Sequence, residues 1–281
     1  MGVTFAALNR WVNNRAEPRP GMVAKIEAAL AEHGVVDLAS PMGKVKRNVL
    51  LHKRKKLPKP LAQILKRRDI FDSFILALTY NSNRIEGSTF TEKDTAAVVF
   101  DGVTLPRKTL VEHLEAKNHA AALEFLFAYL GDGGVVNETL VKKLHSILMN
   151  AIYPDAGLYR RHGVRIVGSR TITANYLKVP DLIKALFKQA QNKSVNTFYD
   201  ITKFHAEFEK IHPFADGNGR VGRLILTAML LKDNFPPAIV SQRRKREYYA
   251  ALEKAQTKEN YAALEEFICD SINGGYKIFE V

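Results

Sequence analysis

The residues best suited to chemistry lie in one short stretch, HPFADGNGRVGR, from His212 to Arg223. A run with helical apolar spacing precedes it and a strongly apolar run, LILTAMLL, follows it, so the pattern predicts a loop between two buried helices. Glycine lets the backbone approach a ligand closely, and the free amides of a helix N-terminus attract anions. We therefore expect the backbone at Gly217 and Gly219 to form a cradle for an anion.

The charged side chains of the same stretch suit a polyphosphate ligand. Arg220 and Arg223 are three residues apart, which puts both guanidinium groups on one face of the first helical turn. Asp216 would repel a bare phosphate, but it can hold Mg²⁺ that bridges phosphate oxygens. His212, at the entrance of the loop, can accept a proton near neutral pH. These residues predict proton transfer beside a magnesium-bound polyphosphate.

Two other interpretations of this stretch fail. Its GNGRVG segment fits the dinucleotide-binding pattern, but that pattern requires a preceding strand within a βαβ unit, and here a helix is expected. His205 and His212 are seven residues apart, but neither an HExxH motif nor a set of cysteines accompanies them. We therefore expect neither a Rossmann fold nor a zinc site.

The elements that must position the loop are mostly helices. From Asp69 onward, apolar residues recur at helical spacing, which predicts a series of amphipathic helices. Between Val164 and Val179, two β-prone runs flank the turn signal Gly168-Ser169 and predict a short hairpin. The expected fold class is all-α with one β-hairpin, in a domain that spans residues 69–281.

Positive charge is concentrated ahead of this domain. The net charge is +13, and 11 of the 42 Lys and Arg residues lie between Lys44 and Arg68, where no acidic residue occurs. We expect residues 41–68 to form a linker whose basic patch either binds a polyanion or is simply solvated. The spacing of apolar residues within residues 1–40 predicts two short helices, and this stretch resembles the second half of a Cro/repressor-type helix-turn-helix. Residues 1–68 are therefore a candidate DNA contact, which salt would weaken.

Composition excludes several classes of protein. With 46% apolar and 25% charged residues, the chain is neither disordered nor collagen-like. Its longest apolar runs are too short to cross a bilayer, and no secretory signal is expected. The single cysteine, Cys269, excludes a disulfide framework and a thiolate zinc cluster. These features predict a soluble protein of a reducing compartment such as the cytoplasm.

The stretch from His212 to Arg223 matches the Fic motif, HxFx(D/E)GNGRxxR, at every specified position, and the sequence resembles the Fic family over roughly residues 69–272. The resemblance implies a helical bundle with a hairpin flap, and an enzyme that transfers AMP from ATP to a Ser, Thr or Tyr hydroxyl of a target protein. His212 would deprotonate that hydroxyl and Asp216 would hold Mg²⁺. The residues implied to bind the ATP phosphates are Gly217, Asn218, Gly219, Arg220 and Arg223.

A second motif of the family lies upstream. The segment SNRIEG, from Ser82 to Gly87, matches the inhibitory pattern (S/T)xxxE(G/N). In relatives that carry this pattern, the glutamate pairs with the second arginine of the Fic motif. The resemblance therefore implies that Glu86 occupies Arg223 and competes with the γ-phosphate of ATP. Read without the motif, Glu86 is an ordinary carboxylate before a helix-ending glycine.

The resemblance also implies roles outside the two motifs. Tyr249 would stack on the adenine, and Gln256 stands where some relatives place an asparagine that reads the edge of the base. Tyr249 can equally be a core residue. The hairpin at residues 165–176 would act as a flap that aligns the target by strand addition.

Several alternatives remain open on the sequence alone. Other Fic relatives transfer UMP, phosphocholine or a phosphoryl group, or remove AMP from a modified target, a reaction for which Glu86 would position water. A DNA-binding regulator that acts through residues 1–68 is a different class of function. The target protein and the oligomeric state are not predicted by any feature of the sequence.

Overall fold

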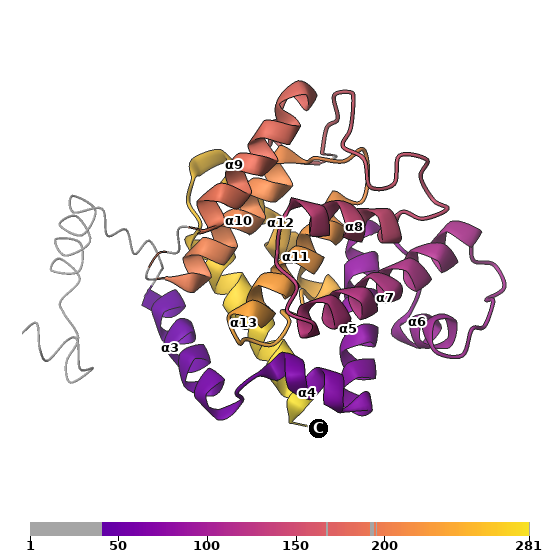
Figure 1. Cartoon of the computed structure of the whole chain (residues 1–281), viewed down its shortest axis with the longest axis horizontal. Helices are drawn as coiled ribbons and strands as arrows, with labels where there is room; N and C mark the ends of the chain where they lie inside the picture. Colours follow the sequence, from indigo (N-terminus) through magenta and orange to yellow (C-terminus); the bar gives the residue numbers. More distant parts are fainter. Residues whose placement is uncertain (1–40, 167, 192–193, 195, 281) are drawn as a thin grey trace, which may run out of the picture. The chain divides into compact units, whose positions relative to one another are not determined.

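A computed structural model describes residues 41–166, 168–191, 194 and 196–280, which form an all-helical structure, as predicted (Figure 1). The two short helices expected within residues 1–40 lie outside the described residues. None of the described helices combines the length and the apolar character needed to span a membrane. The helices are α3 (Pro41–Lys56), α4 (Pro60–Lys66), α5 (Arg68–Glu86), α6 (Glu92–Val99), α7 (Leu110–Gly131), α8 (Glu138–Leu148), η1 (Tyr176–Lys178), α9 (Val179–Gln191), α10 (Thr197–Ile211), α11 (Asn218–Lys232), η2 (Gln242–Arg244), α12 (Lys245–Lys258) and α13 (Ala262–Phe279).

Helix α11 carries the predicted phosphate-binding turn and lies among the other helices. It packs against α5, α7, α8 and α10, and nearly all of its residues are buried (Figure 1). Leu224, Ile225 and Leu231 of α11 join the larger hydrophobic core. Protein interiors are close-packed, so a helix enclosed in this way cannot shift without disturbing its neighbours. The first turn of α11 is therefore held rigidly.

Local sequence signals set the helix ends that matter for the site. Helix α7 begins with a capping box in which Thr109 and Glu112 satisfy each other's backbone amides. Helix α5 ends at Gly87, whose φ of 112° places Glu86 at the last helical position. Helix α11 is different, because its N-cap is Gly217 and no side-chain cap hydrogen bond is made there within the part of the chain that the structure describes. The first backbone amides of α11 remain available to a ligand.

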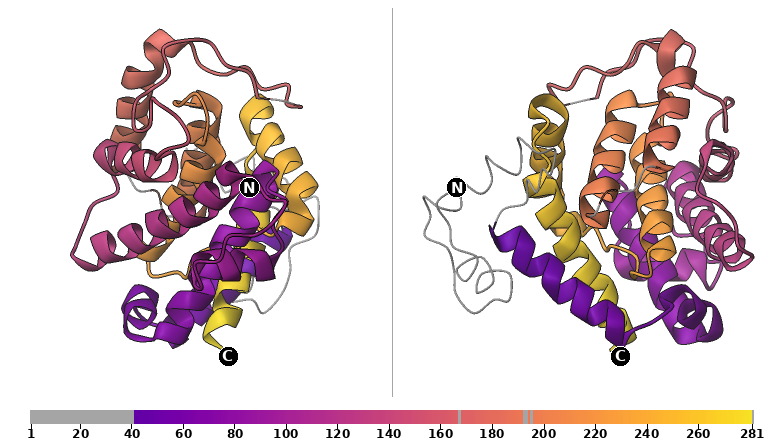
Figure 2. Two further views of the ribbon diagram at one scale, coloured as in Figure 1. Left: turned by 90° about the vertical axis from the view of Figure 1, so that its right-hand side faces the viewer. Right: turned by 60° about the vertical axis from the view of Figure 1, so that its left-hand side comes forward.

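The basic segment that we expected to be a linker forms helices α3 and α4. Helix α3 lies beside α13 (Figure 2), and its Leu50 is fully buried in the second hydrophobic cluster. Lys46 pairs with Glu266 of α13 at 2.8 Å, and Arg47 pairs with the buried Glu265 at 3.2 Å. Part of the basic run is therefore neutralised within the fold. Contact of residues 1–68 with DNA stays a prediction.

The β-hairpin expected between residues 164 and 179 is not formed, because no strand is present among the described residues of this segment. The turn itself is there: the Ser169 amide donates to the carbonyl of Ile166, and Gly168 has a φ of 77°. One side-chain bond, from the Thr173 hydroxyl to the carbonyl of Val164, joins the two limbs at 2.6 Å. The segment is a folded-back loop between α8 and η1, held by side chains rather than by a backbone ladder.

Candidate active site

His212 stands where helix α10 ends and the motif loop begins. Its backbone is left-handed, with φ 53° and ψ 62°, which is uncommon for a residue other than glycine and ends the helix at this point. The imidazole is half-buried and its Nδ1 lies 3.2 Å from the carbonyl of Glu209. A carbonyl only accepts, so Nδ1 carries the hydrogen and Nε2 keeps its lone pair. Burial lowers the pKa of His212, which keeps the ring neutral and able to accept a proton.

Asn218 and Phe214 fix the shape of the motif loop. The Asn218 amide accepts from the Phe214 backbone N–H at 2.8 Å and donates to the Phe214 carbonyl at 2.9 Å. Its side chain is therefore used inside the loop, and only the backbone of Asn218 is available to phosphate. Phe214 is fully buried in the larger core and anchors the loop to it.

His145 of α8 contacts the motif loop at Phe214 and at the carbonyl of Asp216. The sequence alone did not indicate this role of His145. Its ring stacks on Phe214, with centroids 3.7 Å apart and planes 4° from parallel. Nδ1 accepts from the Gly157 amide at 2.8 Å, so Nε2 carries the hydrogen and donates to the Asp216 carbonyl at 3.1 Å. Burial lowers the pKa of His145 to about 4, which keeps the ring neutral at pH 7. The ring therefore orients the backbone of Asp216.

Loss of the Phe214 ring, which anchors the motif loop to the core, is expected to destabilise the protein. Replacing Phe214 by Ala removes a fully buried ring and leaves a cavity, so we expect a loss of about 3–5 kcal/mol in the free energy of unfolding. Urea denaturation at neutral pH measures it. Phe100→Ala is the matched control, because Phe100 is 40% exposed and its loss is expected to cost about 0.5 kcal/mol or less. Equal losses for the two variants would contradict the anchoring role.

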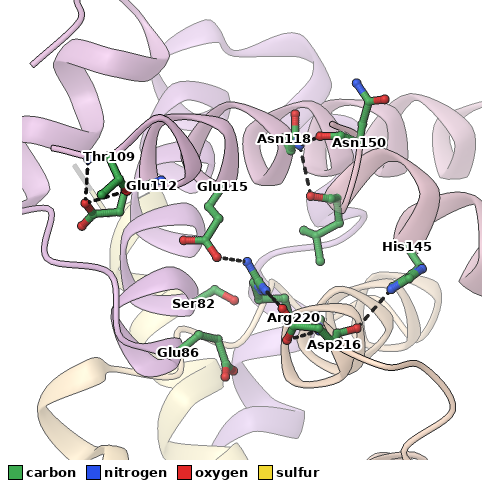
Figure 3. Close-up of polar contacts among 12 residues, drawn as sticks. Ser82, Glu86, Thr109, Glu112, Glu115, Asn118, His145, Asn150, Asp216 and Arg220 are labelled. Carbon is green, nitrogen blue, oxygen red and sulfur yellow. Dashed lines mark hydrogen bonds and ion pairs between the residues drawn. The ribbon is translucent and has the colours of Figure 1, made fainter. Parts of the chain in front are cut away.

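Arg220 is held between two carboxylates. Nη1 donates to Glu115 of α7 at 2.6 Å and Nη2 lies 3.4 Å from Asp216 (Figure 3). The Arg220 side chain is 3% exposed, whereas that of Asp216 is 60% exposed. Asp216 also accepts from the Gly217 amide at 2.6 Å. Glu115 lies 105 residues before Arg220, and nothing near the motif signals it.

Arg223 is bound to the end of α5. Nε donates to the Ser82 hydroxyl at 3.0 Å, and Nη2 donates to the Ser82 carbonyl at 3.1 Å and to Glu86 at 2.7 Å. The pairing of Glu86 with Arg223, which the upstream motif predicts, is therefore present. The two arginines of the motif do not converge on one point as expected, because Arg220 turns toward α7 and Arg223 toward α5.

The Glu86 carboxylate also lies directly over the first turn of α11. A Cβ built on Gly219 would be 2.5 Å from Oε1 of Glu86 and 3.1 Å from Nη1 of Arg223. A side chain at this position would displace the carboxylate, so the carboxylate sits against the backbone of the turn. This is the region where the uncapped amides favour negative charge. Glu86 therefore occupies the position that an anionic ligand of α11 would take.

Arg160 connects the motif loop with the folded-back segment. Its guanidinium donates to the carbonyls of His212 at 2.7 Å and His162 at 2.8 Å, and it also bonds the carbonyl of Ala174. Its own amide donates to the Pro213 carbonyl at 3.0 Å. Arg160 is 4% exposed, so these bonds are made out of water. One side chain thus ties His212 to both limbs of the segment.

The two residues expected near an adenine differ in their surroundings. Tyr249 of α12 is half-buried, and burial together with the charge of Glu86 raises its pKa, which places the ring near the Glu86–Arg223 pair. Gln256 is buried, accepts from the Thr171 hydroxyl at 2.8 Å and donates to the Ala206 carbonyl at 3.2 Å. Both ends of its amide are therefore engaged within the protein, linking α12 to the folded-back segment.

Comparison with known proteins agrees with the fold and the motif. Residues 135–230 match the Fic/DOC family model. The chain is 29% identical over 195 residues to Protein adenylyltransferase fic-1 of Caenorhabditis elegans, covering 67% of this chain and 38% of that protein. It is 29% identical to Protein adenylyltransferase Fic of Nematostella vectensis, covering 67% of this chain and 44% of that protein. The chain spans less than half the length of these two relatives.

Solved structures show the same fold. A Fic family protein from Desulfovibrio desulfuricans superposes with a TM-score of 0.70 at 26% identity, covering 86% of this chain and 74% of that one. Fic-1 from C. elegans superposes with a TM-score of 0.71 at 22% identity, covering 94% of this chain and 78% of that one. The second likeness supports the fold alone, since its identity is low.

Proposed function

Because the chain carries a Fic domain, we propose that it transfers AMP from ATP to a hydroxyl group of a target protein and that Glu86 inhibits this reaction. The observation that carries the proposal is that a neutral base and an anion site lie at the two ends of the same loop. His212 keeps Nε2 free at one end of the motif loop, and helix α11 begins with uncapped amides at the other. The buried Arg223 stands beside that turn.

In the proposed reaction, His212 acts as the general base. Nε2 takes the proton of a Ser, Thr or Tyr hydroxyl as the oxygen attacks the α-phosphorus of ATP. The new O–P bond forms while the bond to pyrophosphate breaks, so AMP is transferred and pyrophosphate leaves. A positioned base is expected to contribute about 10²- to 10⁴-fold to the rate. The amides of α11, and Arg223 once it is released, would stabilise the negative charge of the phosphates.

The residues present fit Mg²⁺ as part of an ATP complex. Magnesium is usually bound by one or two carboxylates together with substrate phosphates and water. No group of three or more potential ligand side chains occurs among the described residues, but Asp216 offers a mostly exposed carboxylate beside the loop. Asp216 would hold the ion, which would neutralise charge on the phosphates. Arg220 and the Gly217 amide would keep the Asp216 carboxylate in place.

Inhibition follows from competition for one position. Glu86 lies against Gly219 and pairs with Arg223, so a terminal phosphate of ATP that used both would have to displace the carboxylate. ATP would then bind weakly, or in a pose that does not favour attack.

The adenine and the target would be bound outside the motif loop. Tyr249 would stack on the adenine, whereas the internal bonds of Gln256 favour a supporting role over base reading. The folded-back segment, whose described residues form no β-ladder, would align the target by strand addition.

The group transferred is tested with labelled ATP. Purified Glu86→Gly protein is incubated with cell extract and ATP that carries a radioactive label on either the α- or the γ-phosphate. We expect the labelling that the added protein causes, above that of extract alone, to come from the α position only, because AMP retains that phosphate and pyrophosphate takes the other two. Mass spectrometry of the labelled band then identifies the modified side chain.

If the labelling that the added protein causes came from the γ position alone, the reaction would be phosphoryl transfer and not AMP transfer. If the added protein caused no labelling from either position, both reactions would be refuted. Release of free AMP from an already modified target by the wild-type protein, which keeps Glu86, would show that the domain works in the opposite direction. These outcomes separate AMP transfer, phosphoryl transfer and AMP removal.

A further inference from the structure

A second buried carboxyl group, that of Glu209, lies next to Arg223 and is not used in the proposed reaction. Glu209 is on α10, one turn before His212, and is 5% exposed. Its Oε1 atom has no hydrogen-bond partner among the described residues. A Cβ built on Gly222 of α11 would be 2.1 Å from Oε1, so the carboxyl group sits against the helix backbone. A buried carboxyl oxygen without a partner is costly unless the group finds a partner in another state of the protein.

Arg223 has a matching unpartnered atom. Ser82 and Glu86 bind its Nε and Nη2, but Nη1 is buried without a hydrogen-bond partner in the described structure. Nη1 lies against Gly219 and Oε1 of Glu209 lies against Gly222, one helical turn further along. Two complementary groups thus lie against neighbouring turns of α11, and each has one atom without a partner among the described residues.

The charges around Glu209 depend on Glu86. Burial raises the pKa of Glu209 to about 8, the Arg223 guanidinium opposes this rise and the Glu86 carboxylate adds to it. Other titratable groups that face it are the hydroxyls of Tyr248 and Tyr249 on α12. Helices α9 and α13 also pack on α10, but no charged group of theirs acts on Glu209 within the part of the chain described here. Glu209 is therefore neutral at pH 7 while Glu86 holds Arg223.

Removal of Glu86 reverses this balance. The part of the rise in the pKa of Glu209 that comes from Glu86 disappears, whereas burial and the attraction of Arg223 remain, so the pKa falls and ionisation of the acid is favoured. A phosphate that later binds Arg223 restores negative charge at the same place and raises the pKa again. Proton binding by Glu209 is thus linked to what occupies Arg223.

We propose that Glu209 is a positioning residue for Arg223: it becomes the carboxylate partner of the guanidinium when Glu86 leaves, and it yields that place to a phosphate of the nucleotide. The acid releases one proton to solvent when Glu86 leaves, and the carboxylate takes one from solvent when the phosphate binds. No other bond forms or breaks. Glu209 thus prevents a bare buried guanidinium between inhibitor and nucleotide. The inference rests on the proposed function insofar as the anion is ATP.

Proton uptake during nucleotide binding tests the proposal. Binding of Mg-ATP to full-length Glu86→Gly protein is measured by calorimetry at pH 7.5 in two buffers with different ionisation enthalpies, which gives the number of protons exchanged. With a pKa of about 8 that falls by about one pH unit when Glu86 is absent, we expect net uptake of about half a proton or more per nucleotide relative to the Glu86→Gly/Glu209→Gln double variant. Glutamine keeps the shape of the protonated acid but cannot titrate. Glu86→Gly/Glu207→Gln is the matched control on the same helix and should keep the uptake.

A second measurement needs no nucleotide. Carboxyl-carbon NMR of wild-type and Glu86→Gly protein follows the titration of Glu209, assigned by the signal that Glu209→Gln removes. We expect the midpoint to fall by at least about one pH unit when Glu86 is absent. An unchanged midpoint, or equal proton exchange by the single and double variants, would overturn the positioning role while leaving ATP binding intact. Failure of all variants to bind ATP would instead refute the proposed function.

Discussion

Glu86→Gly protein is expected to transfer AMP roughly 10- to 100-fold faster than the wild type at limiting ATP, since the binding-competent state is no longer a minor population. In the wild type the carboxylate holds Arg223 at 2.7 Å and lies against Gly219, so both parts of the anion site are occupied. Removing it frees them together. The initial rate of label transfer as a function of ATP concentration measures the change, which should appear chiefly as a lower KM for ATP.

The control for this prediction removes Arg223, the partner of Glu86. If Glu86 acts by occupying Arg223, the Glu86→Gly change should give little or no activation in an Arg223→Ala background, because the site of competition is gone. Glu86→Asp should fall between wild type and Glu86→Gly, since the charge remains but the reach is shorter by one methylene. Activation of equal size with and without Arg223 would show that Glu86 inhibits by another route.

His212→Ala in the Glu86→Gly background should lower the rate of transfer by about 10²- to 10⁴-fold at saturating ATP. The reason is that Nε2 is the free acceptor of a neutral ring, held by the bond from Nδ1 to the carbonyl of Glu209. Nucleotide binding should change little, because the imidazole is not part of the proposed phosphate site. Single-turnover transfer and calorimetry with Mg-ATP separate the two effects.

The dependence of the transfer rate on pH is expected to follow the protonation of His212. Burial lowers the pKa of His212, so the base stays neutral at pH 7 and transfer should be lost only as the pH falls through that lowered pKa. His52→Ala is the matched control, because this exposed histidine lies on α3 and should leave the rate unchanged. A His212→Ala rate close to that of the control would remove His212 from the mechanism.

The sequence predicted the parts of the site that are contiguous or that belong to a known pattern. The loop between two buried helices, with His212 at its entrance, follows from the spacing of residues, and the Glu86–Arg223 pair is implied by the resemblance to the Fic family. Glu115 and His145 could not be found in this way. Each is one residue on a distant helix, and its contact with the loop exists only because α7 and α8 pack against α11.

Where the structure differs from expectation, tertiary contacts outweighed the local pattern. The basic segment at residues 41–68 has the composition of a linker, but buried Leu50 and acids on α13 give α3 a surface on which to pack. Residues 164–175 have β-prone composition and the correct turn, but the segment is held by Arg160 and Gln256 instead of by backbone pairing. Side-chain partners contributed by distant elements are not visible in a local window.

The clamp made by Arg160 has a mechanical consequence. Because one buried guanidinium bonds the carbonyls of His212, His162 and Ala174, the limbs of the folded-back segment cannot be displaced without pulling on the backbone that carries the imidazole. In the proposed reaction, a target polypeptide that docks along that segment would therefore shift His212, the proposed base. Target binding and alignment of the acceptor hydroxyl would then be a single event, and a protein bound in the wrong register would meet a displaced imidazole.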